Sequence, residues 1–139
     1  MSYDWDLIEQ LLLHAQQCAD EPYKAREYGE EVAEERLAQG EPLGGSVDHI
    51  KRVAGDLEGV LFDGGFIQDR PRDHGGTGNN FELTERGVRL LTLIGRSFPE
   101  HLVFRRLLDE QGEEALSAET FDALAASAAR DRIDDKPMI

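Results

Sequence analysis

The chain has 139 residues, 40% of them hydrophobic, which suits the core of one domain and argues against two full-size domains. Its 29 acidic and 15 basic residues give a net charge of -14, which repels bare nucleic acid and anionic membranes at long range and favours a basic partner. The single cysteine, Cys18, excludes an internal disulfide, and no apolar run reaches the ~18–20 residues of a membrane span. Because the first residues are acidic where a signal peptide is basic, we expect a soluble, cytoplasmic protein.

The acidic residues are unevenly distributed. Residues 1–45 carry 11 acids and three bases, residues 46–98 carry eight and seven, and residues 99–139 carry ten and five. The middle of the chain is therefore close to neutral, and the two flanks hold nearly all of the excess negative charge.

The N-terminal third predicts two helices and a loop. Asp4 can cap a first helix over residues 5–19, in which apolar residues recur at the spacing of a core-facing helix. A second helix over about 23–38 has fewer apolar residues and is stopped by Gly40. Its apolar side is assigned to Ala25, Tyr28, Val32 and Leu37. The glycine-rich residues 40–45 predict a loop.

A third helix is predicted from its N-cap, Ser46, to Gly64. Its apolar residues form one stripe, which comprises Val47, Ile50, Ala54, Leu57 and Leu61. Gly55 and Gly59 each weaken the helix by roughly 1 kcal/mol relative to Ala. The sequence therefore leaves open whether the helix breaks near Gly55.

A β-hairpin follows the third helix. Residues 66–69 and 81–83 have the composition of short strands, and the turn-forming residues 71–80 join them. Thr84 is a suitable N-cap for the next helix. The apolar side of that helix is assigned to Val88, Leu91 and Ile94.

Two further helices are predicted in the last third. One opens at Pro99 and ends before Gly112. Its apolar side is assigned to Leu102, Phe104, Leu107 and Leu108. The other is capped by Ser117, and Leu116 is expected to pack against Phe121 as a hydrophobic staple.

Three helices, a hairpin and a further helix follow one another in the order of a winged helix-turn-helix. Three short motifs punctuate this order: Asp4-Trp5-Asp6-Leu7-Ile8, Gly65-Phe66-Ile67, and Leu83-Thr84-x-x-Gly87 followed by Leu90-Leu91. Together they resemble a phage- and prophage-associated family of unknown function with a winged-helix-like domain, over residues 4–16 and 57–128. The resemblance implies a mobile-element context and a small helical fold, and it transfers no catalytic residues. The acidic residues 20–45 look like an insertion relative to that pattern.

We therefore expect a mainly α fold with a small β-hairpin. Residues 1–98 are assigned to a winged helix-turn-helix-like domain that carries an acidic helical insertion at about 20–45. Residues 99–139 are assigned to a C-terminal helical pair packed on that domain.

Five glutamates of the second helix share one helical face, opposite Tyr28 and Val32. They are Glu27, Glu30, Glu31, Glu34 and Glu35, at positions i, i+3, i+4, i+7 and i+8. Such a row of carboxylates can imitate a phosphate backbone and bind Arg or Lys in a nucleic-acid-binding channel; the simpler interpretation is a solvated surface. On the first interpretation the protein is a non-enzymatic phage or mobile-element protein that binds and inhibits a host nucleic-acid-handling protein, for example a CRISPR or restriction complex.

The alternative function is a winged-helix DNA-binding regulator. In that case Lys51 and Arg52 of the third helix, with Arg70 and Arg72 of the wing, would contact DNA. The competing interpretation is that these bases are solvated or paired with Asp48, Asp56, Asp69 and Asp73. The negative charge of the chain favours the second interpretation, because neutralising phosphates drives DNA binding.

Catalytic chemistry has no clear basis in the sequence. The four histidines, His14, His49, His74 and His101, lie far apart and lack the spacing of metal ligands or of a nucleophile and its base. We therefore expect no metal site, no cofactor and no enzymatic activity.

Overall fold

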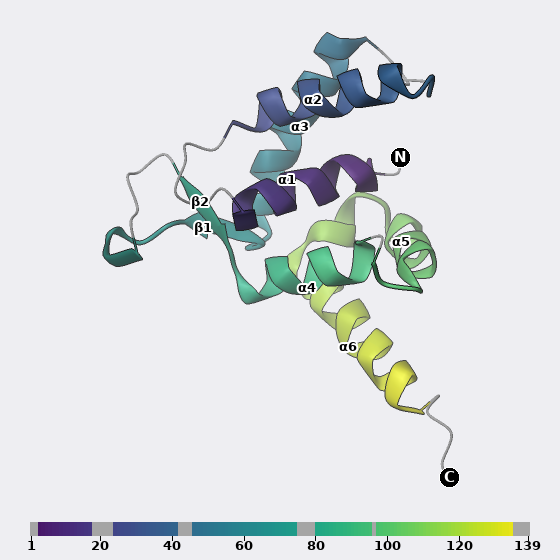
Figure 1. Ribbon diagram of the computed structural model, residues 1–139. Helices are drawn as coiled ribbons and strands as arrows, with labels where there is room; N and C mark the ends of the chain where they lie inside the picture. Colours follow the sequence, from purple (N-terminus) through teal and green to yellow (C-terminus); the bar gives the residue numbers. More distant parts are fainter. Residues whose placement is uncertain (1–2, 18–23, 42–45, 75–79, 96, 135–139) are drawn as a thin grey trace.

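A computed structural model describes residues 3–17, 24–41, 46–74, 80–95 and 97–134, without the side chains of residues 74 and 129–134. In chain order the elements are α1 (Trp5–Gln17), α2 (Ala25–Ala38), α3 (Val47–Asp63), β1 (Ile67–Asp69), the 3-10 helix η1 (Arg72–His74), β2 (Phe81–Leu83), α4 (Glu85–Ile94), α5 (His101–Glu110), the 3-10 helix η2 (Gly112–Leu116) and α6 (Ala118–Asp134). The prediction of a mainly helical fold with one small antiparallel hairpin is confirmed (Figure 1). Parts of the loop predicted at 40–45 and of the turn predicted at 71–80 lie outside the described ranges, as does Cys18.

α1 lies in the middle of the molecule, with α2 and α3 on one side and α4 to α6 on the other (Figure 1). It begins at the predicted cap, where the Leu7 backbone N–H donates to Asp4 Oδ1 at 3.1 Å. Three further residues of the helix, Ile8, Leu11 and Leu12, are fully buried together with Leu7. α1 therefore supplies the core that both sides of the molecule share.

α3 is one continuous helix. The His49 backbone N–H donates to the predicted cap, Ser46 Oγ, at 3.1 Å. The helix passes through Gly55 without interruption, which settles the question that the sequence left open. Most of the predicted stripe is buried, namely Ile50, Ala54, Leu57 and Leu61.

The hairpin is anchored to the core at its base. Its register pairs Ile67 with Leu83, Gln68 with Glu82, and Asp69 with Phe81. Phe66 is completely buried, and its carbonyl oxygen accepts a hydrogen bond from the Thr84 backbone N–H at 3.1 Å. A Cβ at Gly87 would collide with this carbonyl, so the start of α4 approaches the hairpin as closely as only glycine permits.

α4 starts at the predicted cap, because the Gly87 backbone N–H donates to Thr84 Oγ1 at 3.1 Å. The predicted apolar side is wrong in part, since Val88 is 44% exposed. The buried side comprises Gly87, Leu90 and Ile94 instead. The contact between Gly87 and Phe66 turns that side inward and leaves Val88 at the surface.

α5 begins at His101, two residues later than predicted, because turns occupy residues 97–100. Phe104 and Leu108 are buried as expected. Two other residues that the sequence assigned to the apolar side of this helix are exposed, Leu102 by 64% and Leu107 by 37%. The same holds for Leu37 of α2, which is 56% exposed. For α5 the reason is that a polar residue, Arg105, occupies the side of the helix that faces the body.

α6 projects away from the rest of the protein (Figure 1). Its first turns are fixed to the core by Phe121, whose ring meets those of Phe66 and Phe104 edge-on at centroid distances of 5.0 and 6.3 Å. Within the described ranges, no helix has both the length and the apolar composition needed to cross a bilayer.

Candidate interaction surfaces

The acidic side of α2 faces away from the protein because the opposite side is packed tightly. A Cβ at Gly29 would lie 2.8 Å from Ala54 Cβ and 3.2 Å from the Ile50 carbonyl oxygen, so α2 and α3 are in close contact there. Tyr28 and Val32 are buried on the same side of α2, as predicted. The packing therefore fixes the rotation of the helix and, with it, the direction of its glutamates.

The acidic face of α2 consists of Glu27, Glu30, Glu31, Glu34 and Glu35. Glu30 is half-buried and the other four are exposed. Two of them form ion pairs, Glu27 with Lys24 at 3.9 Å and Glu30 with Lys51 at 3.7 Å. A third, Glu31, has a carboxylate oxygen 3.5 Å from His14 Nε2. Glu34 and Glu35 make no ion pair with any residue in the described ranges. The spacing in the sequence thus placed the five glutamates on one face, but it did not predict that Lys24, Lys51 and His14 lie against them.

Lys51, one of the predicted DNA contacts, lies between α2 and α3. It pairs with Glu30 rather than with Asp48 or Asp56, the partners that the competing interpretation named. Arg52 is exposed on the outer face of α3, one helical turn from each of those two aspartates. The exposed face of the helix that would read DNA in a winged-helix protein therefore carries more acid than base.

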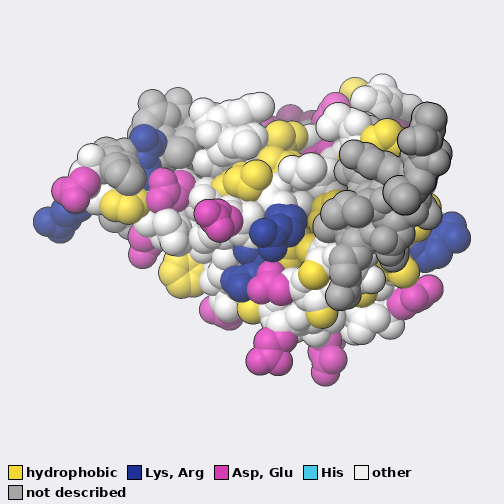
Figure 2. Space-filling view, turned by 90° about the horizontal axis from the view of Figure 1, so that it is seen from below, with side chains coloured by type: hydrophobic (Ala, Val, Ile, Leu, Met, Phe, Trp, Pro, Cys, Tyr) yellow, Lys and Arg dark blue, Asp and Glu magenta, His cyan; other side chains and the backbone are white. Residues whose placement is uncertain are grey.

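Arg70 and Arg72 follow β1 in the hairpin and complete the predicted basic set. Arg70 is half-buried, and its Nε atom makes no hydrogen bond within the described part of the chain. Arg72 is exposed in η1 beside the acidic Asp73. On the face of the protein seen in Figure 2, basic side chains are scattered and stand beside acidic and hydrophobic ones.

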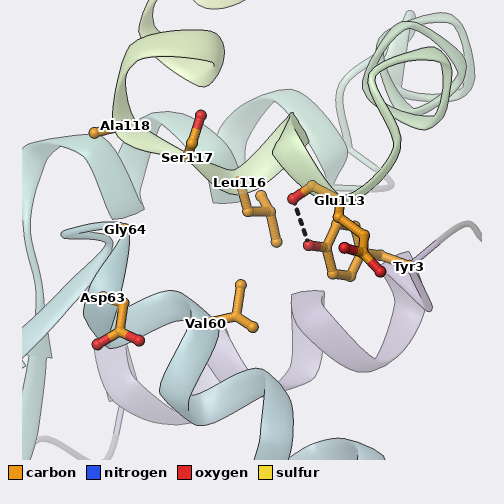
Figure 3. A pocket seen from close by; sticks show the side chains of 8 residues that line it. All are labelled: Tyr3, Val60, Asp63, Gly64, Glu113, Leu116, Ser117 and Ala118. Carbon is orange, nitrogen blue, oxygen red and sulfur yellow. Dashed lines mark hydrogen bonds between the residues drawn. The ribbon is translucent and has the colours of Figure 1, made fainter.

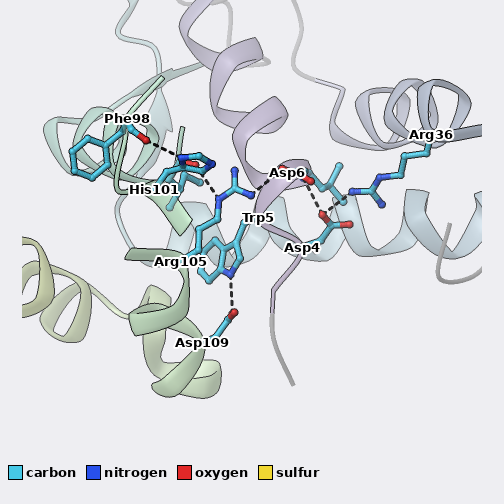
Figure 4. Close-up of polar contacts among 10 residues, drawn as sticks. Asp4, Trp5, Asp6, Arg36, Phe98, His101, Arg105 and Asp109 are labelled. Atoms are coloured by element: carbon cyan, nitrogen blue, oxygen red, sulfur yellow. Dashed lines mark hydrogen bonds and ion pairs between the residues drawn. The ribbon is translucent and has the colours of Figure 1, made fainter. Parts of the chain in front are cut away.

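The N-terminal motif Asp4-Trp5-Asp6 contacts two other helices, α2 and α5, and its α5 partner Arg105 also contacts α4 (Figure 4). Arg36 Nη2 of α2 donates a hydrogen bond to Asp4 Oδ1 at 2.8 Å, and Trp5 Nε1 donates to Asp109 Oδ1 of α5 at 2.8 Å. Arg105 of α5 donates twice, from Nη1 to Asp6 Oδ1 and from Nε to the Ile94 carbonyl oxygen of α4, both at 2.9 Å. The motif is therefore structural in this protein. Sequence reasoning found the motif but missed this role, because its partners lie far along the chain.

The segment Leu83-Thr84-Glu85-Arg86-Gly87 after the hairpin is structural as well. Arg86 Nε and Nη2 donate to the two carboxylate oxygens of Asp122 at 2.9 and 2.8 Å, and Nη1 donates to the Gly64 carbonyl at 3.0 Å. The hydrogen bonds from Arg86 lower the pKa of Asp122. This arginine, one of the bases that make the middle of the chain nearly neutral, is thus engaged by the protein itself.

An open cleft of about 620 Å³ lies between the end of α3, η2 and the start of α6 (Figure 3). It is lined by Tyr3, Val60, Asp63, Gly64, Glu113, Leu116, Ser117 and Ala118. The Tyr3 hydroxyl donates to the Glu113 carbonyl at 2.8 Å, and its pKa is raised by burial and by the charge of Glu113. Two carboxylates and, among the described residues, no basic side chain line the cleft, so this lining would repel an anionic ligand.

Two of the histidines whose side chains are described take part in local contacts. His14 stacks on Tyr28 with ring centroids 3.8 Å apart, and His101 Nδ1 lies 2.7 Å from the Phe98 carbonyl oxygen. Among the described residues, no group of three or more His, Cys, Asp or Glu side chains is arranged to hold a metal ion.

No family model, curated protein or solved structure matches the chain. Its function must therefore be argued from the surfaces described above.

Proposed function

We propose that the protein is a non-enzymatic interaction protein of a phage or mobile element. It binds a host protein that handles nucleic acid, such as a CRISPR or restriction complex, and inhibits it by occupying basic surface that would otherwise contact phosphates. The observation that carries the proposal is the acidic face of α2, which points outward while the opposite side of the helix is locked against α3.

The geometry of this face supports binding to Arg and Lys. Neighbouring carboxylates on a helix have their Cβ atoms about 5–6 Å apart, and Glu34 and Glu35 have no internal ion pair within the described ranges. The pairs of Glu30 and Glu31 are partly exposed and 3.5–3.7 Å long. Exposed pairs of this kind are worth about 0–1 kcal/mol, so a basic partner could displace them.

The mobile-element context rests on the sequence resemblance. In this chain the matching motifs have structural roles, since they cap helices and join α1 to its neighbours. They therefore support a shared winged-helix-like fold more directly than a shared activity.

The alternative, a DNA-binding regulator, has weaker support. It would use Lys51, Arg52, Arg70 and Arg72, of which Lys51 is paired with Glu30 and Arg52 lies between two aspartates. A gel shift at low salt separates the two functions, because the favoured one requires no binding to duplex DNA at micromolar protein. A shift that disappears on replacing Arg52 and Arg72 by Ala would favour the regulator.

The favoured function is tested with the triple variant Glu31→Lys/Glu34→Lys/Glu35→Lys. Immobilised wild-type protein should retain a nucleic-acid-handling protein from a nuclease-treated bacterial lysate and should inhibit the nucleic-acid binding of that protein once it is purified. The triple variant should lose both effects, and raised salt should weaken the complex. Asp56→Lys/Asp69→Lys/Glu85→Lys makes the same change of charge at exposed positions elsewhere and should retain both; equal behaviour of the two triple variants would contradict the proposal.

A further inference from the structure

The cleft between the end of α3, η2 and the start of α6 is walled by segments that lie far apart in the sequence (Figure 3). A Cβ at Gly64 would lie 2.5 Å from the Leu116 carbonyl oxygen, so the end of α3 is in close contact with η2. The Tyr3 hydroxyl donates to the Glu113 carbonyl at 2.8 Å and joins the start of the chain to η2. These contacts fix the walls of the cleft before any ligand binds, as is usual for small-molecule sites.

The cleft has an apolar centre and two acidic sides. The Val60 and Leu116 side chains point toward each other at its centre, and Leu116 is only 2% exposed. Asp63 and Glu113 lie on opposite sides of this centre (Figure 3). Both carboxylates are exposed, and neither forms an ion pair with a residue in the described ranges.

α3 ends at this cleft with an unfavourable charge. Asp63 is the last residue of the helix, and the last turn contains no basic residue. The C-terminal end of a helix dipole favours a cation and disfavours a carboxylate. The start of α6 brings a positive dipole end to the same cleft, but Glu119 in its first turn already complements that end. A cation beside Asp63 would therefore relieve a repulsion that the free protein carries.

The arrangement selects among classes of ligand. Both carboxylates would repel an anion. A single metal ion could not bind both, because the apolar centre separates them, and among the described residues no group of three or more metal-ligating side chains is arranged to hold one. A lysine side chain of another protein brings one ammonium group, whereas the cleft offers two carboxylates. A linear aliphatic ligand with a cation near each end matches the two acidic sides and the apolar centre together.

We propose that the cleft binds a linear aliphatic polyamine, a free small molecule whose protonated amines are separated by methylene groups. One ammonium group would lie beside Asp63 and another beside Glu113, with the methylene groups on Val60 and Leu116. No residue of α2 lines the cleft, so the proposal does not depend on the acidic face of that helix.

The test is a titration of the isotopically labelled full chain with spermidine, an aliphatic polyamine, followed by NMR. Binding should shift the amide resonances of residues 60–64 and of η2. Butylamine, a monoamine, should bind about fivefold more weakly, because it can pair with only one carboxylate. Absence of spermidine binding, equal binding of the two amines, or shifts confined to α2 would overturn the proposal. Tighter binding of a lysine-containing peptide than of spermidine would overturn it in favour of a protein partner.

Matched variants locate the site. Asp63→Asn/Glu113→Gln should weaken spermidine binding about tenfold, because both ion pairs with the ligand are lost. Glu34→Gln/Glu35→Gln removes the same charge from the exposed face of α2 and should leave the affinity unchanged. All four side chains are exposed, and Tyr3 binds the backbone of Glu113 rather than its side chain, so both variants should fold. Equal affinities of the two double variants for spermidine would contradict the proposed site.

The single variant Asp63→Asn separates a ligand site from a merely structural carboxylate. It should weaken spermidine binding and at the same time raise the melting temperature of the free protein, because it removes the repulsion at the end of α3. A lower melting temperature would mean that Asp63 supports the fold, and it would contradict the proposal.

Discussion

α2 and α5 each pack one side against the body and expose the other, yet they are held in different ways. α2 is positioned by close contact of small groups, Gly29 against Ala54 of α3. α5 is positioned by polar contacts, from Arg105 to Asp6 and from Trp5 to Asp109. Close packing thus directs the glutamates of α2 outward, whereas a buried arginine on α5 leaves Leu107, which was predicted to be buried, exposed at the surface.

If shape holds α2, filling the contact should have the largest effect. Gly29→Val should lower the free energy of unfolding by about 2–3 kcal/mol, because its side chain would overlap Ala54 and the Ile50 carbonyl. Urea unfolding followed by circular dichroism measures this. Gly59 lies in α3, and a Cβ there would have no atom within 4 Å. Gly59→Ala should therefore raise the free energy of unfolding by roughly 0.5–1 kcal/mol. Equal stability of Gly29→Val and wild type would show that α2 is not held by this contact.

If polar contacts hold α5, removing Asp6 should have the next largest effect. Asp6→Ala leaves Arg105 largely buried without its carboxylate and should cost about 2 kcal/mol, less than for a fully buried pair because Asp6 is 43% exposed. Asp109→Asn keeps an oxygen for the Trp5 indole and should cost about 0.5 kcal/mol or less. The double variant Asp6→Ala/Arg105→Met should recover part of the loss in urea unfolding; no recovery would mean that Asp6 acts independently of Arg105.

The difference between α2 and α5 also explains which features of the fold could be predicted from the sequence alone. The caps at Asp4, Ser46 and Thr84, the hairpin and the acidic face of α2 are local features, fixed by residue type and by spacing along one helix. They could be predicted because their causes lie within a few residues of one another.

The rotation of α5 could not be predicted in that way. Its apolar spacing favours burial of Leu107, but Arg105 reaches Asp6, which is 99 residues away in the sequence. The exposure of Val88 likewise depends on the contact of Gly87 with Phe66, which only the folded chain brings together. Errors arose where a distant partner, rather than the pattern of the helix itself, decides which side faces inward.

The ion pair of Arg86 and Asp122 joins α4 to α6 at the surface and should contribute less than the pair of Asp6 and Arg105. Asp122 is 42% exposed, so Asp122→Asn should cost at most about 1 kcal/mol at neutral pH. Because folding lowers the pKa of Asp122 below its ordinary value of 3.8, the stabilisation is complete above that pH and is lost as the pH falls through the lowered pKa. Unfolding measured from pH 7 to pH 2 should therefore show the two proteins converging only in acid. Asp56→Asn makes the same change at an exposed position with no ion pair to described residues and serves as the control.

The smallest expected effect concerns the acidic face itself. Glu34 lies one turn from both Glu30 and Glu31, and like charges at this spacing destabilise a helix by about 0.2–0.5 kcal/mol per pair. Glu34→Gln should therefore raise the free energy of unfolding by about 0.5 kcal/mol at low salt, with the gain shrinking in 1 M salt, where charges are screened within about 3 Å. Glu114→Gln, an exposed glutamate of η2, is the control for the amide substitution. A higher free energy of unfolding for Glu34→Gln would mean that the row of glutamates lowers the stability of α2, which is the behaviour expected of residues kept for binding. A lower free energy of unfolding would mean that Glu34 stabilises the helix, and this would weaken the case for a binding role.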